Sequence, residues 1–170
     1  LAYDRCQVGV VTDAGGADQL AEYYVNDPEQ MYAILRTQVD VVLRDGAAVL
    51  NAADPLVAKM AGLCDGQVIF YSADPREEAL AHHQSQGGRA VFVRDARVIF
   101  ATGKTEVPLV ALEALPLDRS GEQGCDIECV LAAAAAAWAL GVPADLIQTG
   151  LATLEASPAD TSRPLTLHTA

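Results

Sequence analysis

VVLRDGAAVLNAADP, residues 41–55, is the stretch that decides the fold of this chain. It combines the end of a helix, a turn at Gly46, an apolar strand and a polar exit from Asn51 to Pro55. In open α/β proteins, ligands bind beyond the carboxyl ends of the parallel strands, which is where such an exit lies. The stretch therefore predicts an α/β protein with a binding site at the end of this strand.

The alternation of strand and helix continues on both sides of this stretch. Three strand–helix units are predicted. The first and third strands lie at residues 7–12 and 68–71, the second strand ends with residues 49–51, and the helices begin at Asp27, Asp54 and Asp74. Each of these acids precedes a proline, which suits an N-cap followed by the first helical position. The first strand is expected to be buried on both faces. The first helix is expected to bury an apolar stripe of Met31, Ile34, Leu35 and Val39.

The pattern changes after Gly88. Residues 90–94 and 97–101 alternate apolar and polar positions around Asp95-Ala96, which favours an antiparallel hairpin. A further strand is predicted at 107–112, and two helices at 126–140 and 143–154. The fold class is therefore α/β, with a mixed, mainly parallel sheet, flanking helices and an antiparallel hairpin. Residues 1–156 form the predicted domain, and residues 157–170 a linker or tail.

Composition excludes several classes of partner. The chain has 170 residues, a net charge of -12 and only 11 basic residues, which argues against nucleic acid and against an anionic membrane surface. The apolar run at 130–140 is far shorter than the roughly 20 residues that a membrane span needs. Four cysteines without paired C-x-x-C spacing are expected to be buried thiols of a cytoplasmic protein. Because the chain starts at Leu1, we expect it to be a piece of something longer.

Two segments are candidate sites, each with a simpler alternative. Asp13 and Asp18 follow the first strand, so they could bind Mg²⁺ together with phosphate oxygens, or they could form a glycine turn and cap a helix. The Asn51 amide could contact a nucleotide, whereas capping is favoured over catalysis for Asp54. Gly103-Lys104-Thr105 is no phosphate loop, because that motif needs a glycine where this chain has Val98.

Other polar or aromatic residues favour structural roles. His82 and His83 are consecutive on a predicted helix and are expected to be exposed. Trp138 lies in an alanine-rich helix and is expected to anchor the core.

A family resemblance rests on the order of several short segments, Asp4–Cys6, Val10–Thr12, Gly15–Leu20, Pro28–Met31, Leu35–Thr37, Asn51–Pro55 and Ala132–Gly141. In this order the chain resembles the Mur-ligase-like part of cyanophycin synthetases, from about residue 2 to about residue 155. The resemblance implies the later half of a central ATPase domain, which uses ATP and Mg²⁺. The whole enzyme would add arginine to the side-chain carboxylate of poly-aspartate through an acyl-phosphate.

The resemblance also suggests site residues, several of which depart from the family pattern. For metal, it points to Asp18 and Gln19, although the family has histidine in place of Gln19. For the nucleotide, it points to the four residues Asn51, Glu128, Arg36 and Arg163. Cys129 replaces the asparagine that usually follows Glu128, and Ala53 replaces an acid. Arg36 lies where Mur ligases often carry a carbamoylated lysine, and Ser162 replaces a glycine beside Arg163.

The sequence therefore predicts part of an ATP-dependent amino-acid ligase that is inactive alone, because its phosphate loop is absent. One alternative is a degenerate, non-catalytic module for assembly or polymer binding. Another is an unrelated α/β binding module. If the sheet is incomplete, apolar surface is exposed, and the chain is expected to self-associate as a homo-oligomer.

Overall fold

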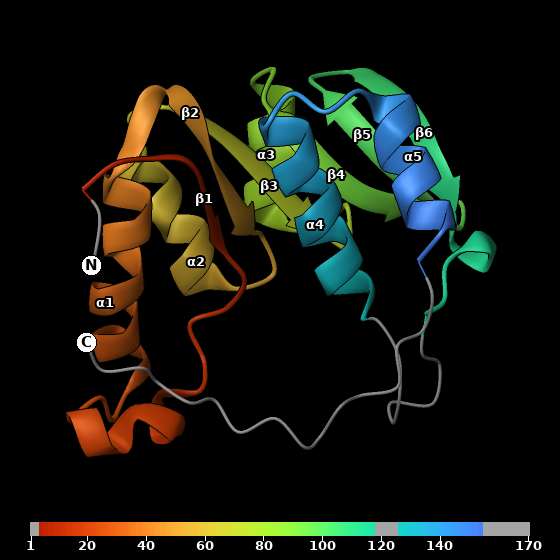
Figure 1. Ribbon diagram of the computed structural model, residues 1–170. Coiled ribbons are helices and arrows are strands. Elements are labelled where there is room, and N and C mark those ends of the chain that lie inside the picture. Colours follow the sequence, from red (N-terminus) through yellow and green to blue (C-terminus); the bar gives the residue numbers. More distant parts are fainter. Residues whose placement is uncertain (1–3, 118–125, 155–170) are drawn as a thin grey trace.

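The computed structural model describes residues 4–117 and 126–154, without the side chains of Asp18, Gln19 and Ala21. Its centre is one six-stranded sheet in which the strands follow each other in chain order (Figure 1). The strands are β1 (Cys6–Val11), β2 (Val42–Asn51), β3 (Gln67–Ser72), β4 (Arg89–Arg94), β5 (Arg97–Thr102) and β6 (Thr105–Ala111). The pairs from β1 to β4 are parallel, whereas β4–β5 and β5–β6 are antiparallel. The predicted mixed sheet is confirmed.

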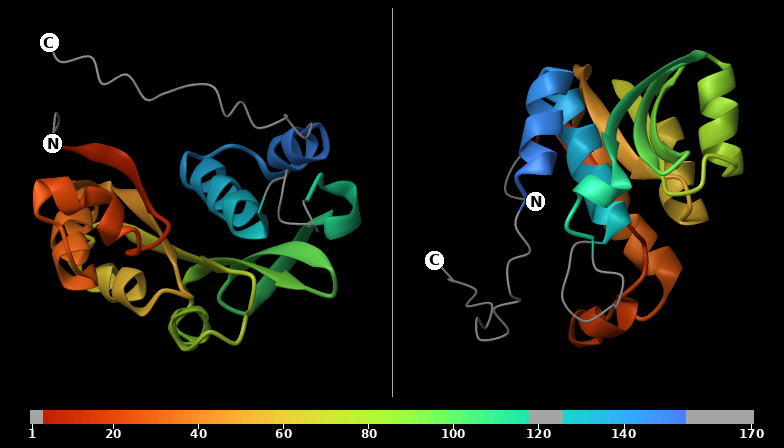
Figure 2. Two further views of the ribbon diagram at one scale, coloured as in Figure 1. Left: turned by 90° about the horizontal axis from the view of Figure 1, so that it is seen from below. Right: turned by 90° about the vertical axis from the view of Figure 1, so that its right-hand side faces the viewer.

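Helices cover both faces of the sheet. The helices are α1 (Pro28–Asp40), α2 (Pro55–Lys59), α3 (Glu78–Ser85), α4 (Ile127–Ala139) and α5 (Ala144–Ala152), with short 3-10 helices η1 (Ala17–Tyr23), η2 (Met60–Leu63) and η3 (Leu112–Ala114). Figure 2 shows α1, α2 and α3 on one face, and α4 with α5 on the other. Each parallel connection moves one strand along in the same direction and parallel crossovers are right-handed, so the three connecting helices share a face.

Two apolar cores fill the space between the sheet and its helices. One core, beneath α4 and α5, includes Tyr71 and Leu131, while the other includes Leu50 and Phe92 beneath α1, α2 and α3. Residues 49 and 50 of β2 therefore point into opposite cores, as expected for a central strand. Edge strand β1 is less enclosed than predicted, because Val8 and Val10 are only partly buried.

The aspartate caps at the first two helices are confirmed. The Asp27 carboxylate accepts a hydrogen bond from the backbone N–H of Gln30 at 2.8 Å. Asp54 caps α2 in the same manner. Within α1, however, the predicted stripe is partly wrong: Met31 and Val39 are buried, but Ile34 is 45% exposed. The predicted stripe of four apolar residues is wider than the face that α1 buries against the sheet.

Gly46 lies within strand β2, so the predicted helix end and turn at residues 41–46 are wrong. Helix α1 ends earlier, at Asp40, and β2 begins at Val42. The pairing of β1 with β2 steps from Cys6–Val42 to Val8–Ala47, so the intervening part of β2 bulges. A Cβ atom at position 46 would lie 2.4 Å from the carbonyl oxygen of Gln7. Glycine is needed here for close approach of two strands, which in sequence is indistinguishable from a turn.

The start of α3 also differs from the prediction. The helix begins at Glu78, without a side-chain cap from Glu77, rather than after Asp74. The Asp74 carboxylate instead accepts from the backbone N–H of Arg76 at 2.8 Å and pairs with its guanidinium at 2.7 Å. A strong local partner therefore holds these residues in a turn.

Among the described residues, no helix is long and apolar enough to cross a membrane.

Candidate functional site

The candidate site is the edge of the sheet where the parallel strands end. The carboxyl ends of β1, β2 and β3 are neighbours, because Val11 pairs with Leu50 and Asn51 pairs with Tyr71. The amino end of α4 lies beside them, since Glu128 contacts the residue that follows β3. This edge therefore gathers the residues that follow three strands with the first turn of a helix, an arrangement that suits ligands in α/β proteins.

Asp54 is fully occupied by backbone contacts at this edge. Its Oδ1 accepts hydrogen bonds from the N–H groups of Leu56 at 2.9 Å and Val57 at 3.2 Å, which caps α2. Its Oδ2 accepts from the N–H of Ala14 at 2.7 Å, which ties the loop after β1 to the loop after β2. The preference for capping over catalysis is thus supported, but the bond to Ala14 was not predicted. No sequence signal links positions that are 40 residues apart.

The other polar groups of these loops are held by local turns. Asp13 accepts from the Gly15 N–H at 3.1 Å and from the Thr12 hydroxyl at 3.1 Å, and its side chain is exposed. The Asn51 oxygen accepts from the Ala53 N–H at 2.9 Å. These bonds fix the side chains in place, and Asn51 stays partly buried at the end of β2. Both residues are therefore preorganised at the edge.

Glu128 carries the clearest unsatisfied group of the site. Its Oε1 accepts from the N–H of Ala73 at 3.0 Å, whereas its buried Oε2 has no hydrogen-bond partner within the described part of the chain. Asp126 caps α4 by accepting from the Glu128 N–H at 3.2 Å, which positions this side chain. A buried carboxylate oxygen without a donor is costly. The position therefore favours a cation or a hydrogen-bond donor beside Glu128.

The electrostatics of this edge are acidic. Burial raises the pKa of Tyr71 well above its ordinary value, and the charge of Glu128 raises it further, with smaller contributions from Cys129, Asp13 and Asp126. Negative groups therefore surround the end of β3, so bare phosphate is disfavoured while a divalent cation is favoured. Among residues 4–117 and 126–154, no three His, Cys, Asp or Glu side chains form a cluster that could hold a metal ion. Mg²⁺ typically combines one or two carboxylates with phosphate oxygens, which fits this edge.

The remaining candidate residues lie elsewhere or outside the described part. Asp18 and Gln19 belong to η1, but their side chains are outside the part that the structure describes, as is Arg163. Arg36 lies in the third turn of α1, where its Nε is 3.4 Å from Asp40, and the structure does not bring it to the Glu128 edge. Site roles for these four residues stay predictions.

Two other expectations need correction, and a third is supported. Cys129, in the first turn of α4, is exposed, and Cys6 and Cys64 are only partly buried, so the expectation of buried thiols is wrong for these three cysteines. His82 is exposed as predicted, but His83 is half-buried, with its ring edge-on to Phe70 at 5.2 Å. Trp138 packs against the core as predicted: its side chain is half-buried, and its ring stacks on the buried ring of Phe100 at 4.5 Å.

Two predictions about turns are confirmed: Gly103-Lys104-Thr105 is no phosphate loop, and Asp95-Ala96 is the turn of a hairpin. Gly103 and Lys104 form the tight connection between β5 and β6, and Gly103 has a φ of 56°. A phosphate loop would connect a strand to a helix. Asp95 and Ala96 both have positive φ in the β4–β5 turn, as a type I′ turn requires.

Comparison with solved structures defines the class of fold. A UDP-N-acetylmuramoylalanyl-D-glutamyl-2,6-diaminopimelate–D-alanyl-D-alanyl ligase from Acinetobacter baumannii matches 90% of this chain with a TM-score of 0.58 and 19% identity. A structure of MurF from Acinetobacter baumannii matches with a TM-score of 0.60. This chain covers 30% of each of those chains. The fold is that of part of a Mur ligase.

Comparison of sequences identifies nearer relatives. Cyanophycin synthetase of Crocosphaera subtropica is 34% identical over 157 residues, which are 92% of this chain and 18% of the relative. That of Synechocystis is 32% identical over 161 residues, or 95% of this chain and 18% of the relative. UDP-N-acetylmuramoylalanine–D-glutamate ligase of Symbiobacterium thermophilum is 37% identical over 103 residues, or 59% of this chain and 19% of the relative. No family model matches the chain.

The protein is therefore a homologue of cyanophycin synthetases over nearly its whole length, as the sequence resemblance predicted. The chain spans about 18% of the length of these relatives.

Proposed function

We propose that this chain contributes the acidic part of an ATP–Mg²⁺ pocket in an enzyme that ligates amino acids. The observation that carries the proposal is the Glu128 Oε2 atom, a buried acceptor without a described donor at the carboxyl edge of the sheet. The similarity to cyanophycin synthetases and to a Mur ligase supports a ligase. Mg²⁺ would neutralise charge on the phosphates of ATP there.

The residues of the chain have separable roles in this proposal. Glu128 would hold the cation or one of its waters through Oε2, while its bond to Ala73 keeps the carboxylate in place. The Asn51 side chain, fixed by its bond to Ala53, would contact the nucleotide. The reaction proposed for the complete protein is addition of arginine to the side-chain carboxylate of poly-aspartate. The sequence contains no phosphate-loop motif, so the chain alone is expected to be inactive.

Calorimetric titration of Mg²⁺-ATP tests this function. The titration is done on the 170-residue chain and on the longest protein that its gene encodes, each with a Glu128→Gln variant. Because Glu113 is an exposed carboxylate in η3, which follows β6 and lies three strands along the sheet from β3, Glu113→Gln is the matched control. We expect the longer protein to bind Mg²⁺-ATP, Glu128→Gln to weaken binding at least tenfold, and Glu113→Gln to leave it unchanged. Binding that is insensitive to Glu128→Gln would contradict the proposed site.

A second candidate is a degenerate module that binds a polymer or assembles with other chains. Two observations favour it: Cys129 stands where the related pattern has an amide, and the carboxylate oxygens of Asp13 and Asp54 already accept hydrogen bonds within the chain. This alternative predicts that even the longest protein binds no Mg²⁺-ATP. The same titration therefore separates the two functions.

A further inference from the structure

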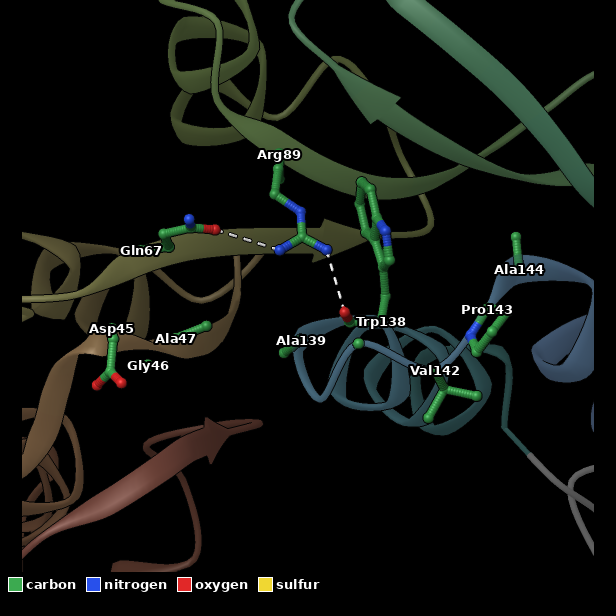
Figure 3. A pocket seen from close by; sticks show the side chains of 11 residues that line it. Asp45, Gly46, Ala47, Gln67, Arg89, Trp138, Ala139, Val142, Pro143 and Ala144 are labelled. Atoms are coloured by element: carbon green, nitrogen blue, oxygen red, sulfur yellow. Dashed lines mark hydrogen bonds between the residues drawn. The ribbon is translucent and has the colours of Figure 1, made fainter.

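A second hollow lies at the opposite edge of the sheet, where β2, β3 and β4 begin. Its volume is about 410 Å³, and it is bounded by residues 45–47 of β2, the first residues of β3 and β4, and the link from α4 to α5. Figure 3 shows Arg89 in its centre, with Gln67 on one side and Trp138 on the other. The hollow lies at the amino ends of the parallel strands, whereas Glu128 lies at their carboxyl ends. The length of the strands separates the two sites.

The Arg89 guanidinium is held rigidly in this hollow. One nitrogen donates to Gln67 Oε1 at 3.2 Å, and another donates to the carbonyl oxygen of Trp138 at 3.2 Å. The guanidinium lies 3.8 Å from the centroid of the Trp138 ring, whose orientation is fixed by stacking on Phe100 at 4.5 Å. The cation is thus oriented by three contacts, and two of its five N–H groups are used in described hydrogen bonds.

No described carboxylate neutralises this cation. Arg36, Arg44, Arg76 and Arg94 each pair with an acid, but Arg89 has no such partner within ion-pair distance in residues 4–117 and 126–154. Asp45 lines the same hollow, yet Figure 3 shows its carboxylate directed away from Arg89. The Arg89 side chain is partly buried, and this burial lowers the pKa of its guanidinium below its ordinary value. A half-buried cation of this kind is stabilised by an anion.

The start of α5 adds a second favourable feature. Pro143 and Ala144 border the hollow, and no side chain caps this nine-residue helix. The unpaired N–H groups and the positive end of the helix dipole therefore face the same region as Arg89. Gly46, Ala139 and Gly141 line the remainder with small side chains, which leaves room for a small molecule. The hollow combines a fixed donor pair, an uncapped helix start and free space.

We propose that this hollow binds a small anion through an oxyanion group, either a phosphate or a carboxylate, held by the free N–H groups of Arg89 and the first N–H groups of α5. The planar guanidinium presents paired donors that match either group. The chain carries a net charge of -12, so Arg89 is the local positive charge that would have to hold the anion here. The proposal is independent of the nucleotide pocket at the other edge.

The fluorescence of Trp138, the one tryptophan of the sequence, gives a direct readout of this hollow. The chain is titrated separately with inorganic phosphate and with succinate, and sodium chloride is used at matched ionic strength as a reference. We expect a saturable change in emission with one of the two anions, which identifies the group that is bound. Equal responses to chloride, or no saturable change with either anion, would overturn the proposal.

Two variants and one control assign the response to Arg89. Arg89→Gln should raise the dissociation constant at least tenfold, while Arg97→Gln, which changes an exposed arginine of β5, should leave it unchanged. If Arg89→Gln does not fold, Ala144→Glu decides, because it retains Arg89 and places a competing carboxylate at the mouth of the hollow. We expect this variant to lose binding at least tenfold and to keep its melting temperature, since an acid in the first turn suits a helix. Unchanged affinity in Ala144→Glu would refute the site.

Discussion

Replacing Asp54 with alanine removes two kinds of contact, and their separate costs are measurable. The variant loses the cap of α2, for which the expected cost is about 1 kcal/mol. It also loses the 2.7 Å bond from the Ala14 N–H, and a hydrogen bond to a charged acceptor contributes about 2 kcal/mol. The free energy of unfolding of Asp54→Ala should therefore fall by about 3 kcal/mol.

Asp27 provides a matched comparison, because it also caps a helix with proline at the first position. Its carboxylate contacts only the backbone of Gln30 among the described residues, so Asp27→Ala should cost about 1 kcal/mol. Asp54→Asn retains one acceptor oxygen for the cap but replaces the second oxygen with an amide nitrogen. It should cost about 2 kcal/mol, the contribution of the link to Ala14.

Urea denaturation measures these differences, with far-ultraviolet circular dichroism and tryptophan emission as the two probes. The midpoints should follow the order Asp54→Ala below Asp54→Asn below Asp27→Ala, with unchanged slopes. If Asp54→Asn is as stable as the parent, or if Asp54→Ala and Asp27→Ala lose equal stability, then the connection between the loops after β1 and β2 contributes nothing and the argument fails.

Three further predictions concern other regions. Gly46→Ala should lower the free energy of unfolding by about 2 kcal/mol, because the new Cβ atom would lie 2.4 Å from a backbone oxygen. Gly62 has open space around it, so Gly62→Ala should change the free energy of unfolding little, and urea denaturation of both variants measures the difference. The pKa of Tyr71 is raised in the folded state, so its contribution to the free energy of unfolding is fully present below about pH 10 and is lost as the pH rises above that value. Tyr71→Phe should therefore make the fall of the free energy of unfolding above pH 10 less steep, by up to about 1.4 kcal/mol per pH unit. A decline of equal slope in both proteins would refute this. The side chain and backbone N–H of Arg76 lower the pKa of Asp74 to about 2, so Arg76→Gln should raise this pKa toward 3.8 in a nuclear magnetic resonance titration, and an unmoved value would contradict the pairing.

Most elements of the fold could be predicted from the sequence because their signals are local. Aspartate before proline marked the start of α1 and of α2, and the alternating pattern around Asp95 marked the hairpin. The same kind of signal failed at Asp74, where a nearby arginine competes for the carboxylate. It failed also at Gly46, since the requirement for glycine comes from another strand.

The candidate site was less accessible to sequence reasoning. Asn51 was named from its place at the exit of a strand and again through a resemblance, and Glu128 through the resemblance alone. The structure places both at ends of elements on one edge of the sheet. The link between Asp54 and Ala14, and the oxygen of Glu128 without a donor, depend on contacts between distant segments. Arg89 gave no signal at all, because its surroundings come from β3 and α4 rather than from its neighbours in sequence.

The order of the strands in the sheet has a consequence for how the chain folds. Each strand pairs with the strand that precedes it, so the sheet can grow in the order in which the ribosome releases it. The helix α4 comes late in the chain, yet it packs on β2 and β3. Until α4 has emerged, Val49 and Ile69 therefore lack the cover that they have in the folded protein. A nascent chain that stalls before residue 127 would display this apolar face to chaperones.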